Sequence, residues 1–328
     1  MKTEHVNRVF IPFVVYTCVV CSIFLVSCRE INKNFGRGFR YKNGGEYFGS
    51  NPSMSPDGNK IVFGSIRYGV GDICTVNIDG SSWKRLTDTP EYEGEPKFSP
   101  DGNKIVFVSE RDDGNTGHIY LMDVDGLNQT RLTNTEYYDS NPSFSPDGKK
   151  IAFNRQYGSH NNEIFIMNID GTDQKRLTNT NLSEGEPSFT LNGKDITYPI
   201  LNIMDENRNV EIWTLNIINL NTNRLIEMPN DASLLSISLD GKKIVFLSSK
   251  GTDYTKDQYT RIEVWIMNKD KSDQRQLTYT KNYKSGPAFT PDGKKILFLE
   301  HEPGGRGKGQ IRIINTDGTG LRTIANNY

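Results

Sequence analysis

Short runs of alternating apolar and polar residues, separated by turns rich in Gly, Asp and Asn, follow one another from about residue 46. In the clearest unit, the apolar alternation that marks half-buried strands recurs in four runs, at residues 142–145, 150–153, 163–168 and 175–178. Asp-Gly pairs, which favour tight hairpins, separate the first run from the second and the third from the fourth. The pattern predicts four antiparallel strands, A to D in chain order, with tight A–B and C–D turns and a B–C loop over 155–162.

This unit occurs six times. The A–B turn reads Ser-Pro-Asp-Gly or a close variant, and its glycines are Gly58, Gly102, Gly148, Gly193, Gly241 and Gly293. One four-stranded sheet cannot bury both of its faces, whereas sheets stacked in a ring bury them against their neighbours. The sequence therefore predicts an all-β fold, a six-bladed β-propeller with four antiparallel strands per blade. We expect the blades to start near residues 51, 95, 141, 186, 234 and 286.

The N-terminus has the pattern of a secretory signal. Lys2 and Arg8 precede an apolar run that ends in Leu25-Val26-Ser27-Cys28. This ending resembles the bacterial lipobox, in which the cysteine receives a diacylglyceryl group and becomes the new N-terminus. An uncleaved signal anchor is the alternative, because about eighteen apolar residues can just span a bilayer.

These observations divide the chain into three parts. We expect residues 1–27 to be a lipoprotein signal peptide, 28–45 a polar tether and 46–328 the propeller, with Cys28 as the lipidation site. By analogy with bacterial lipoproteins, Arg29 after the cysteine, where an Asp would direct retention in the inner membrane, favours the outer membrane of the cell envelope. The protein would then face the periplasm or the cell surface.

The repeat resembles that of the TolB propeller. The resemblance rests on the Pro-x-Phe-Ser-Pro-Asp-Gly stretch that ends at Gly148, on Met167-Asn168 followed by Asp170-Gly171, and on Arg176-Leu177-Thr178. It covers about residues 46–325 and implies the propeller fold, but it specifies little about function. TolB carries an α/β domain before its propeller, and prolyl oligopeptidases, which share the repeat, carry a hydrolase domain with a G-x-S-x-G motif. That motif does not occur here, and we expect a stand-alone propeller.

Composition narrows the choice of partners. The net charge is −1 and no basic stripe is visible, which argues against nucleic acid as a partner. Cys74 is the only cysteine after Cys28, so the propeller has no internal disulfide available. We expect a monomer that reaches the membrane only through its N-terminal lipid.

The candidate site follows from topology. The B–C loops and the D–A connections share one rim of the ring, and loops on a rigid scaffold usually carry recognition. Just before the proline that opens strand A stand polar residues on four blades: Asn51, Glu95, Asn141 and Glu186. Converging carboxylates and amides at the mouth of the channel can hold a cation or an amine. The alternative is that they cap neighbouring backbone and recur because the repeat recurs.

No catalytic residues, cofactor or metal site is expected. The Asp-Gly pairs lack the ligand spacing of an EF-hand and are explained as turns. His118, His160 and His301 fall in or beside B–C loops, where we expect exposed side chains. Oligogalacturonate lyases, which have a similar propeller, hold a metal with several histidines, and this chain is poor in histidine.

The first functional hypothesis is a lipid-anchored binding or scaffold module for an envelope protein or glycan. The alternative is a propeller-fold glycan lyase or hydrolase that uses the channel residues.

Overall fold

The structure is a computed structural model, and it describes residues 52–326 except for 66, 68–70, 113, 115, 159–160, 202–209, 230–231, 251–261, 281 and 302–308. The signal peptide, Cys28, the tether, Asn51 and His160 lie outside the described residues, so what the sequence predicts for them stays a prediction.

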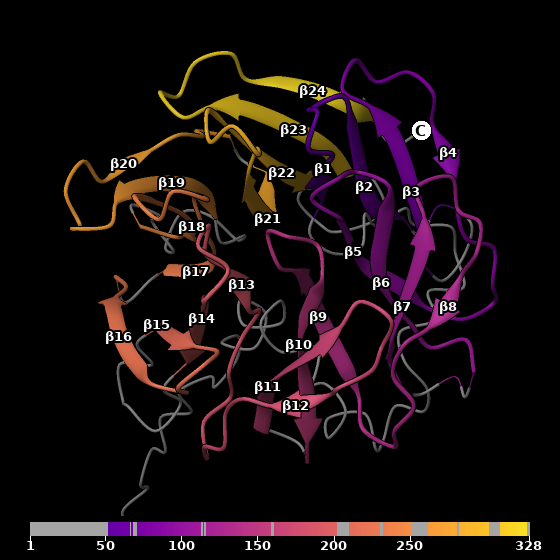
Figure 1. The fold of residues 1–328 in the computed structure, drawn as a ribbon. Helices are drawn as coiled ribbons and strands as arrows, with labels where there is room; N and C mark the ends of the chain where they lie inside the picture. Colours follow the sequence, from indigo (N-terminus) through magenta and orange to yellow (C-terminus); the bar gives the residue numbers. More distant parts are fainter. Residues whose placement is uncertain are drawn as a thin grey trace, which may run out of the picture.

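The described residues form six sheets of four strands, arranged around a ring (Figure 1). Each sheet is built from four consecutive strands, paired in the order A-B-C-D. The predicted six-bladed propeller is confirmed, and the predicted blade starts fall within three residues of the observed ones. No helix in the described part of the chain is long and apolar enough to cross a membrane.

Strand A of each blade lies innermost, next to strand A of its neighbours, and strand D lies outermost (Figure 1). The A strands are β1 (Ser53–Met54), β5 (Glu93–Phe98), β9 (Asp139–Phe144), β13 (Ser188–Phe189), β17 (Ala232–Ile237) and β21 (Tyr283–Phe289). The B strands are β2 (Lys60–Ser65), β6 (Lys104–Ser109), β10 (Lys150–Tyr157), β14 (Asp195–Leu201), β18 (Lys243–Ser248) and β22 (Lys295–His301).

The two outer positions of each blade complete the sheets. The C strands are β3 (Asp72–Asn77), β7 (His118–Asp123), β11 (Asn161–Asn168), β15 (Val210–Asn216), β19 (Glu263–Asn268) and β23 (Gly309–Asn315). The D strands are β4 (Lys84–Arg85), β8 (Thr130–Arg131), β12 (Lys175–Arg176), β16 (Thr222–Glu227), β20 (Arg275–Gln276) and β24 (Arg322–Asn326).

Two boundaries in blade three differ from the prediction. β9 starts at Asp139, three residues early, because a β-bulge at 141–142 lets the pairing with β10 resume on its far side. The expected B–C loop over 155–162 is also wrong. β10 and β11 stay paired as far as Tyr157 and Asn161, so only 158–160 connect them.

The core is divided among the seams between blades. The buried hydrophobic residues fall into six clusters, and each cluster joins two neighbouring blades. Phenylalanines in the middle of strand B are fully buried in five blades, at Phe63, Phe107, Phe153, Phe246 and Phe298. Burying such a side chain contributes about 1.5–3 kcal/mol, so the seams supply most of the stabilisation that holds the ring together.

The A–B turns are held by the side chains of their own motif. In blade three, Ser145 Oγ donates to Asp147 Oδ1 at 2.6 Å, and Lys150 N–H donates to Ser145 Oγ at 2.9 Å. Gly148 has φ = 68°, a left-handed conformation that glycine adopts without strain. The Asp-Gly pair therefore forms the tight A–B turn that the sequence predicts.

The Arg-Leu-Thr triplet of strand D ties the outer edge of a blade to strand C. In blade three, Thr178 Oγ1 accepts from Ile164 N–H at 2.9 Å and donates to Glu163 Oε2 at 2.7 Å. Arg176 pairs with the other oxygen of Glu163 at 2.7 Å, and Leu177 packs into the seam between blades three and four. The threonine bond to strand C recurs at Thr87, Thr133 and Thr278.

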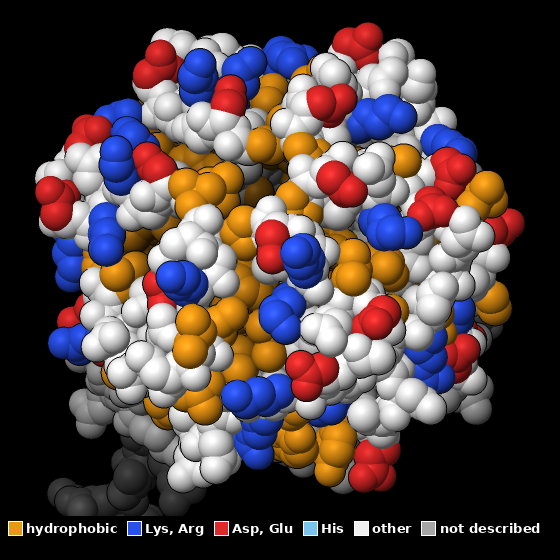
Figure 2. All heavy atoms as spheres, in the orientation of Figure 1, with side chains coloured by type: hydrophobic (Ala, Val, Ile, Leu, Met, Phe, Trp, Pro, Cys, Tyr) orange, Lys and Arg blue, Asp and Glu red, His pale blue; other side chains and the backbone are white. Residues whose placement is uncertain are grey.

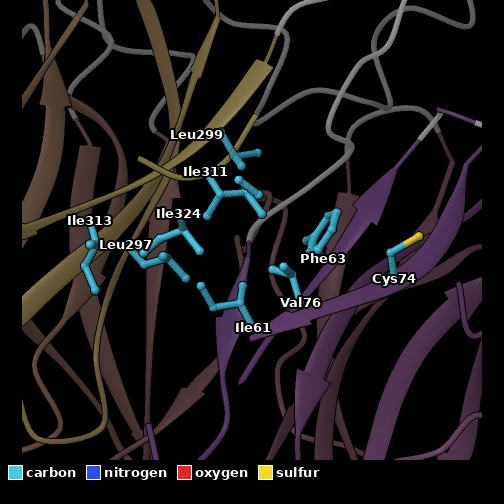
Figure 3. Close-up of a cluster of buried hydrophobic side chains, with 10 residues drawn as sticks. Ile61, Phe63, Cys74, Val76, Leu297, Leu299, Ile311, Ile313 and Ile324 are labelled. Carbon is cyan, nitrogen blue, oxygen red and sulfur yellow. The ribbon is translucent and has the colours of Figure 1, made fainter. Parts of the chain in front are cut away.

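The ring closes without exchange of a strand among the described residues. Blade one contains β1–β4 and blade six contains β21–β24. The two blades meet through Ile61 and Phe63 on one side and Leu299 and Ile311 on the other (Figure 3). One hydrogen bond, from Arg322 Nη1 to Ile78 O at 3.1 Å, crosses the same seam at the edge.

Candidate binding site in the central channel

A cavity of about 200 Å³ lies at the centre of the ring. Its walls come from the inner strands of blades two to six, which contribute Lys97, Asn141, Glu186, Leu234 and Pro287 among others. Figure 2 shows one face of the molecule, where hydrophobic side chains gather around a central hollow and most charged side chains lie farther out. The described residues therefore form a concave site on the ring axis, and concave pockets are where small ligands usually bind.

Two of the predicted site residues, Glu95 and Asn141, lie at a β-bulge in strand A. The pairing of strands A and B shifts register at this point in blades two, three, five and six. Glu95, Asn141, Leu234 and Gly286, the residues at the bulge, have φ of 56°, 52°, 35° and 56°. Bulges re-aim side chains, and left-handed backbone at Glu95 and Leu234 is strained because neither residue is glycine or asparagine.

Glu186 and Asn141 line the cavity, as the prediction placed them. Glu186 Oε1 lies 2.7 Å from Lys97 Nζ. This contact joins blade four directly to blade two, although blade three lies between them in the ring. The two side chains are 33% and 20% exposed, so solvent reaches both. The Glu186 carboxylate, predicted to help hold a cation or an amine, therefore already has the ammonium group of Lys97 beside it.

Glu95 is placed differently. It is buried, it does not line the cavity, and its Oε2 accepts from Asn141 N–H at 2.5 Å. Burial raises the pKa of Glu95 to about 7, although the bond from Asn141 opposes the rise. Glu95 thus braces blade two against blade three in the way the capping alternative describes. The binding role predicted for Asn141 and Glu186 stays a prediction.

Sequence reasoning missed Lys97 and Leu234, although both carry a signal. Lys97 follows the strand A proline, where the other five units have Ser53, Ser143, Ser188, Ser236 and Ala288. Leu234 and Leu235 stand where four other units have a polar residue and a proline and where the sixth has Gly286 and Pro287. In both cases the informative feature is a departure from the repeat.

The wall of the cavity toward blades four and five is apolar. The inner strand of blade four, β13, has two residues, whereas β5, β9, β17 and β21 have six or seven. Pro199 of β14 faces the residues just before Ser188, where the strand would continue in the other blades. Because proline has no N–H, it cannot donate a hydrogen bond to a longer β13. Val210 and Ile212 of β15 consequently reach the cavity and join Leu234 and Leu235 of blade five.

Two carboxyl groups, those of Glu163 and Glu184, interact in the seam between blades three and four. Glu184 also lines the cavity. Glu184 is buried, its Oε1 accepts from Thr180 Oγ1 at 2.8 Å, and its Oε2 has no hydrogen-bond partner among the described residues. Burial raises the pKa of Glu184 to about 7; the bond from Thr180 opposes this and repulsion from Glu163 adds to it. The seam therefore favours the protonated form of Glu184.

The expectation that the histidines are exposed is wrong for the two that the structure describes. His118 opens β7 and is fully buried, with its Nε2 2.7 Å from Arg131 Nη2. His301 ends β22, is buried, and lies 3.0 Å from Ser285 Oγ. Strand pairing extends farther toward this rim than the sequence suggests and carries both histidines inside. Among the described residues, no group of three or more His, Cys, Asp or Glu side chains is arranged to hold a metal ion.

Comparison with known proteins agrees with the repeat and the ring. Residues 41–203 match the model of the TolB beta propeller domain. This chain is a TolB-like β-propeller. A search of curated proteins found no match.

Solved structures share the fold of this TolB-like propeller at low sequence identity. A putative TolB from Agrobacterium tumefaciens is 20% identical with a TM-score of 0.60, over 76% of this chain and 87% of that one. TolB from Acinetobacter baumannii is 21% identical with a TM-score of 0.61, over 91% of this chain and 66% of that one. An oligogalacturonate lyase in complex with manganese is 15% identical with a TM-score of 0.53, over 81% and 88%. At these identities the likeness concerns the fold alone.

Proposed function

We propose that this TolB-like propeller is a binding module of the bacterial cell envelope, which recruits a protein or glycan at the rim that carries the D–A connections. The observation that carries the proposal is the central cavity, whose walls combine a solvent-accessible ion pair with an apolar patch. Mostly apolar concave sites with a few placed polar groups are typical of binding sites. The strained backbone at Leu234, which lines the cavity, also fits a functional site, because such strain tends to persist where function needs it.

The test is capture from envelope extracts by the unaltered chain and by cavity variants. Lys97→Met and Glu186→Gln remove the charges of the cavity, whereas Lys104→Met removes a surface cation paired with Asp123 at 2.9 Å. We expect a partner that the unaltered chain and Lys104→Met capture equally and that both cavity variants lose. A partner retained by both cavity variants would place binding elsewhere. A glycan-degradation screen with metal analysis tests the enzymatic alternative.

We further propose that the module is anchored through a lipid on Cys28 after removal of residues 1–27. The proposal rests on Leu25-Val26-Ser27-Cys28 behind an apolar run. Mass spectrometry should find Cys28 as a lipid-modified N-terminal residue, and Cys28→Ala should abolish both the modification and processing at this site. An unmodified Cys28 in a chain that keeps its N-terminal segment would support a signal anchor.

A further inference from the structure

The central cavity combines three features that select for a small ligand of one kind. Lys97 and Glu186 place one positive and one negative charge side by side, 2.7 Å apart and open to solvent. Among the described residues of the lining, Lys97 is the only cation. The only other lining carboxylate, Glu184, has a buried side chain bonded to Thr180, so Glu186 is the accessible one.

Apolar side chains line the same cavity as this ion pair. Leu234, Leu235 and Pro287 line it, and Val210 and Ile212 continue it into blade four. The seam between blades four and five has Ala232 where the other described seams carry Glu93, Asp139, Glu184 or Lys284. Water against such a wall is poorly held, and an apolar group that displaces it gains affinity.

The size of the cavity limits the ligand. Its volume of about 200 Å³ is below the range of about 300–1,000 Å³ that is usual for drug-sized ligands. A molecule that fits must present a cation and an anion within a few ångströms of each other, next to an aliphatic group. The α-ammonium and α-carboxylate of an amino acid have this arrangement.

We propose that the central cavity binds a free α-amino acid with an aliphatic side chain. The ammonium group donates to Glu186, the carboxylate accepts from Lys97, and the side chain lies against Leu234 and Leu235. Before a ligand binds, Lys97 and Glu186 pair with each other, so neither charge is left unpaired. The amide of Asn141 also lines the cavity and can add a hydrogen bond to the carboxylate. This inference rests on the proposed function in that it takes the cavity to be the ligand site.

Calorimetric titration of the purified full chain in mild detergent tests the inference. L-Leucine should bind, and glycine should bind more weakly because it lacks the side chain. N-acetyl-L-leucine lacks the ammonium group and L-leucinamide lacks the carboxylate, so each should bind about ten-fold to a hundred-fold more weakly than L-leucine. Because these comparisons use the unaltered protein, they do not depend on the folding of a variant.

Variants test the same contacts from the protein side. Lys97→Met and Glu186→Gln should each weaken L-leucine binding about ten-fold or more, and Lys104→Met should leave it unchanged. Equal binding of L-leucine and its two blocked derivatives, or no binding of any aliphatic amino acid at millimolar concentration, would overturn the inference. If the envelope partner is still captured in that case, the binding module stands and only the amino-acid ligand is lost.

Discussion

At the scale of single residues, buried charge distinguishes one seam from the next. Each described seam places the first residues of strand A beside the start of strand C on the preceding blade, and most of the acids there have a basic partner. Asp139 pairs with Arg155 at 2.7 Å, and Glu263 pairs with Lys284 at 2.8 Å. Glu184 faces Glu163, which Arg176 already neutralises, so one carboxyl of this seam has no cation of its own. Seams that are built from the same strand positions therefore differ in how their stability depends on pH.

We predict that Glu184→Gln flattens the pH dependence of stability. The pKa of Glu184 rises from 4.5 to about 7 on folding. Between these values the unfolded chain loses the proton and the folded chain keeps it, so stability falls as pH rises from about 4.5 and levels off above about 7. Such a shift corresponds to about 3 kcal/mol at pH 8. Denaturant titrations should show Glu184→Gln to be more stable than the unaltered protein at pH 8 and similar to it at pH 4.5.

The control for this prediction is Glu136→Gln, which changes an exposed carboxyl in the connection between blades two and three. It should leave the pH profile as it is. Glu95, whose pKa also rises to about 7, titrates in the same window, so Glu184→Gln should remove only part of the slope. An unchanged slope in Glu184→Gln would mean that the carboxyl is solvated in solution.

At the scale of elements, the hairpins and the bulges were not equally predictable. The A–B turn depends only on nearby residues. Ser145 donates to Asp147 and accepts from Gly148 N–H, so a few neighbouring residues specify the turn. The bulge in strand A depends on the register between two strands and, at Glu95, on a bond from the next blade. The sequence marks its position by the proline that follows, but not its geometry. The Lys97–Glu186 contact joins two blades that are not neighbours, and no local pattern predicts it.

Two turn glycines that look alike in sequence should differ in tolerance to alanine. Gly148 and Gly171 both have positive φ, 68° and 84°, so each alanine costs about 1–2 kcal/mol from backbone strain. A Cβ at Gly148 would lie 3.7 Å from Pro100 Cδ, an ordinary contact. A Cβ at Gly171 would lie 2.7 Å from the carbonyl oxygen of Leu132 on the neighbouring blade. We expect Gly171→Ala to lower the melting temperature more than Gly148→Ala, and equal losses would contradict the close contact between blades.

The threonine of the Arg-Leu-Thr triplet should matter for stability as much as a core contact. Thr178→Val keeps the shape of the side chain but leaves Ile164 N–H without its acceptor and removes a bond to Glu163. A buried polar group left unsatisfied costs about 1–3 kcal/mol. Thr130→Val, at an exposed threonine whose hydroxyl donates to Asn128 O at 3.3 Å, should cost less than about 0.5 kcal/mol. Chemical denaturation of the two variants measures the difference.

At the scale of the whole molecule, the ring closes in the described residues through packing and one hydrogen bond at the edge, without exchange of a strand. A propeller whose first and last blades share a sheet is held by strand hydrogen bonds, whereas here each of these blades has its own four strands. The seam between blades one and six relies on its hydrophobic cluster (Figure 3). Residues 1–51 lie outside the described residues.

Cys74 provides a probe of that seam. Its side chain is 0% exposed and belongs to the cluster between blades one and six. Burial raises the pKa of the Cys74 thiol to about 12, so the reactive thiolate is scarce as long as the seam stays closed. In the native protein a thiol reagent should therefore modify Cys74 only during opening of the seam. Peptide-resolved mass spectrometry separates this modification from that of the three N-terminal cysteines.

Loosening the seam between blades one and six should accelerate the modification of Cys74 more than loosening the seam between blades five and six. Leu299→Ala creates a cavity in the cluster that contains Cys74, and Leu247→Ala creates one between blades five and six. Leucine-to-alanine changes in a core cost about 2–5 kcal/mol, so the two variants can be compared at equal loss of global stability by adjusting denaturant. If the ring opens at the seam between blades one and six, Cys74 reacts faster in Leu299→Ala than in Leu247→Ala under these matched conditions. Equal rates would show that Cys74 becomes accessible only when the whole ring unfolds, and that a seam without strand exchange is as firm as the others.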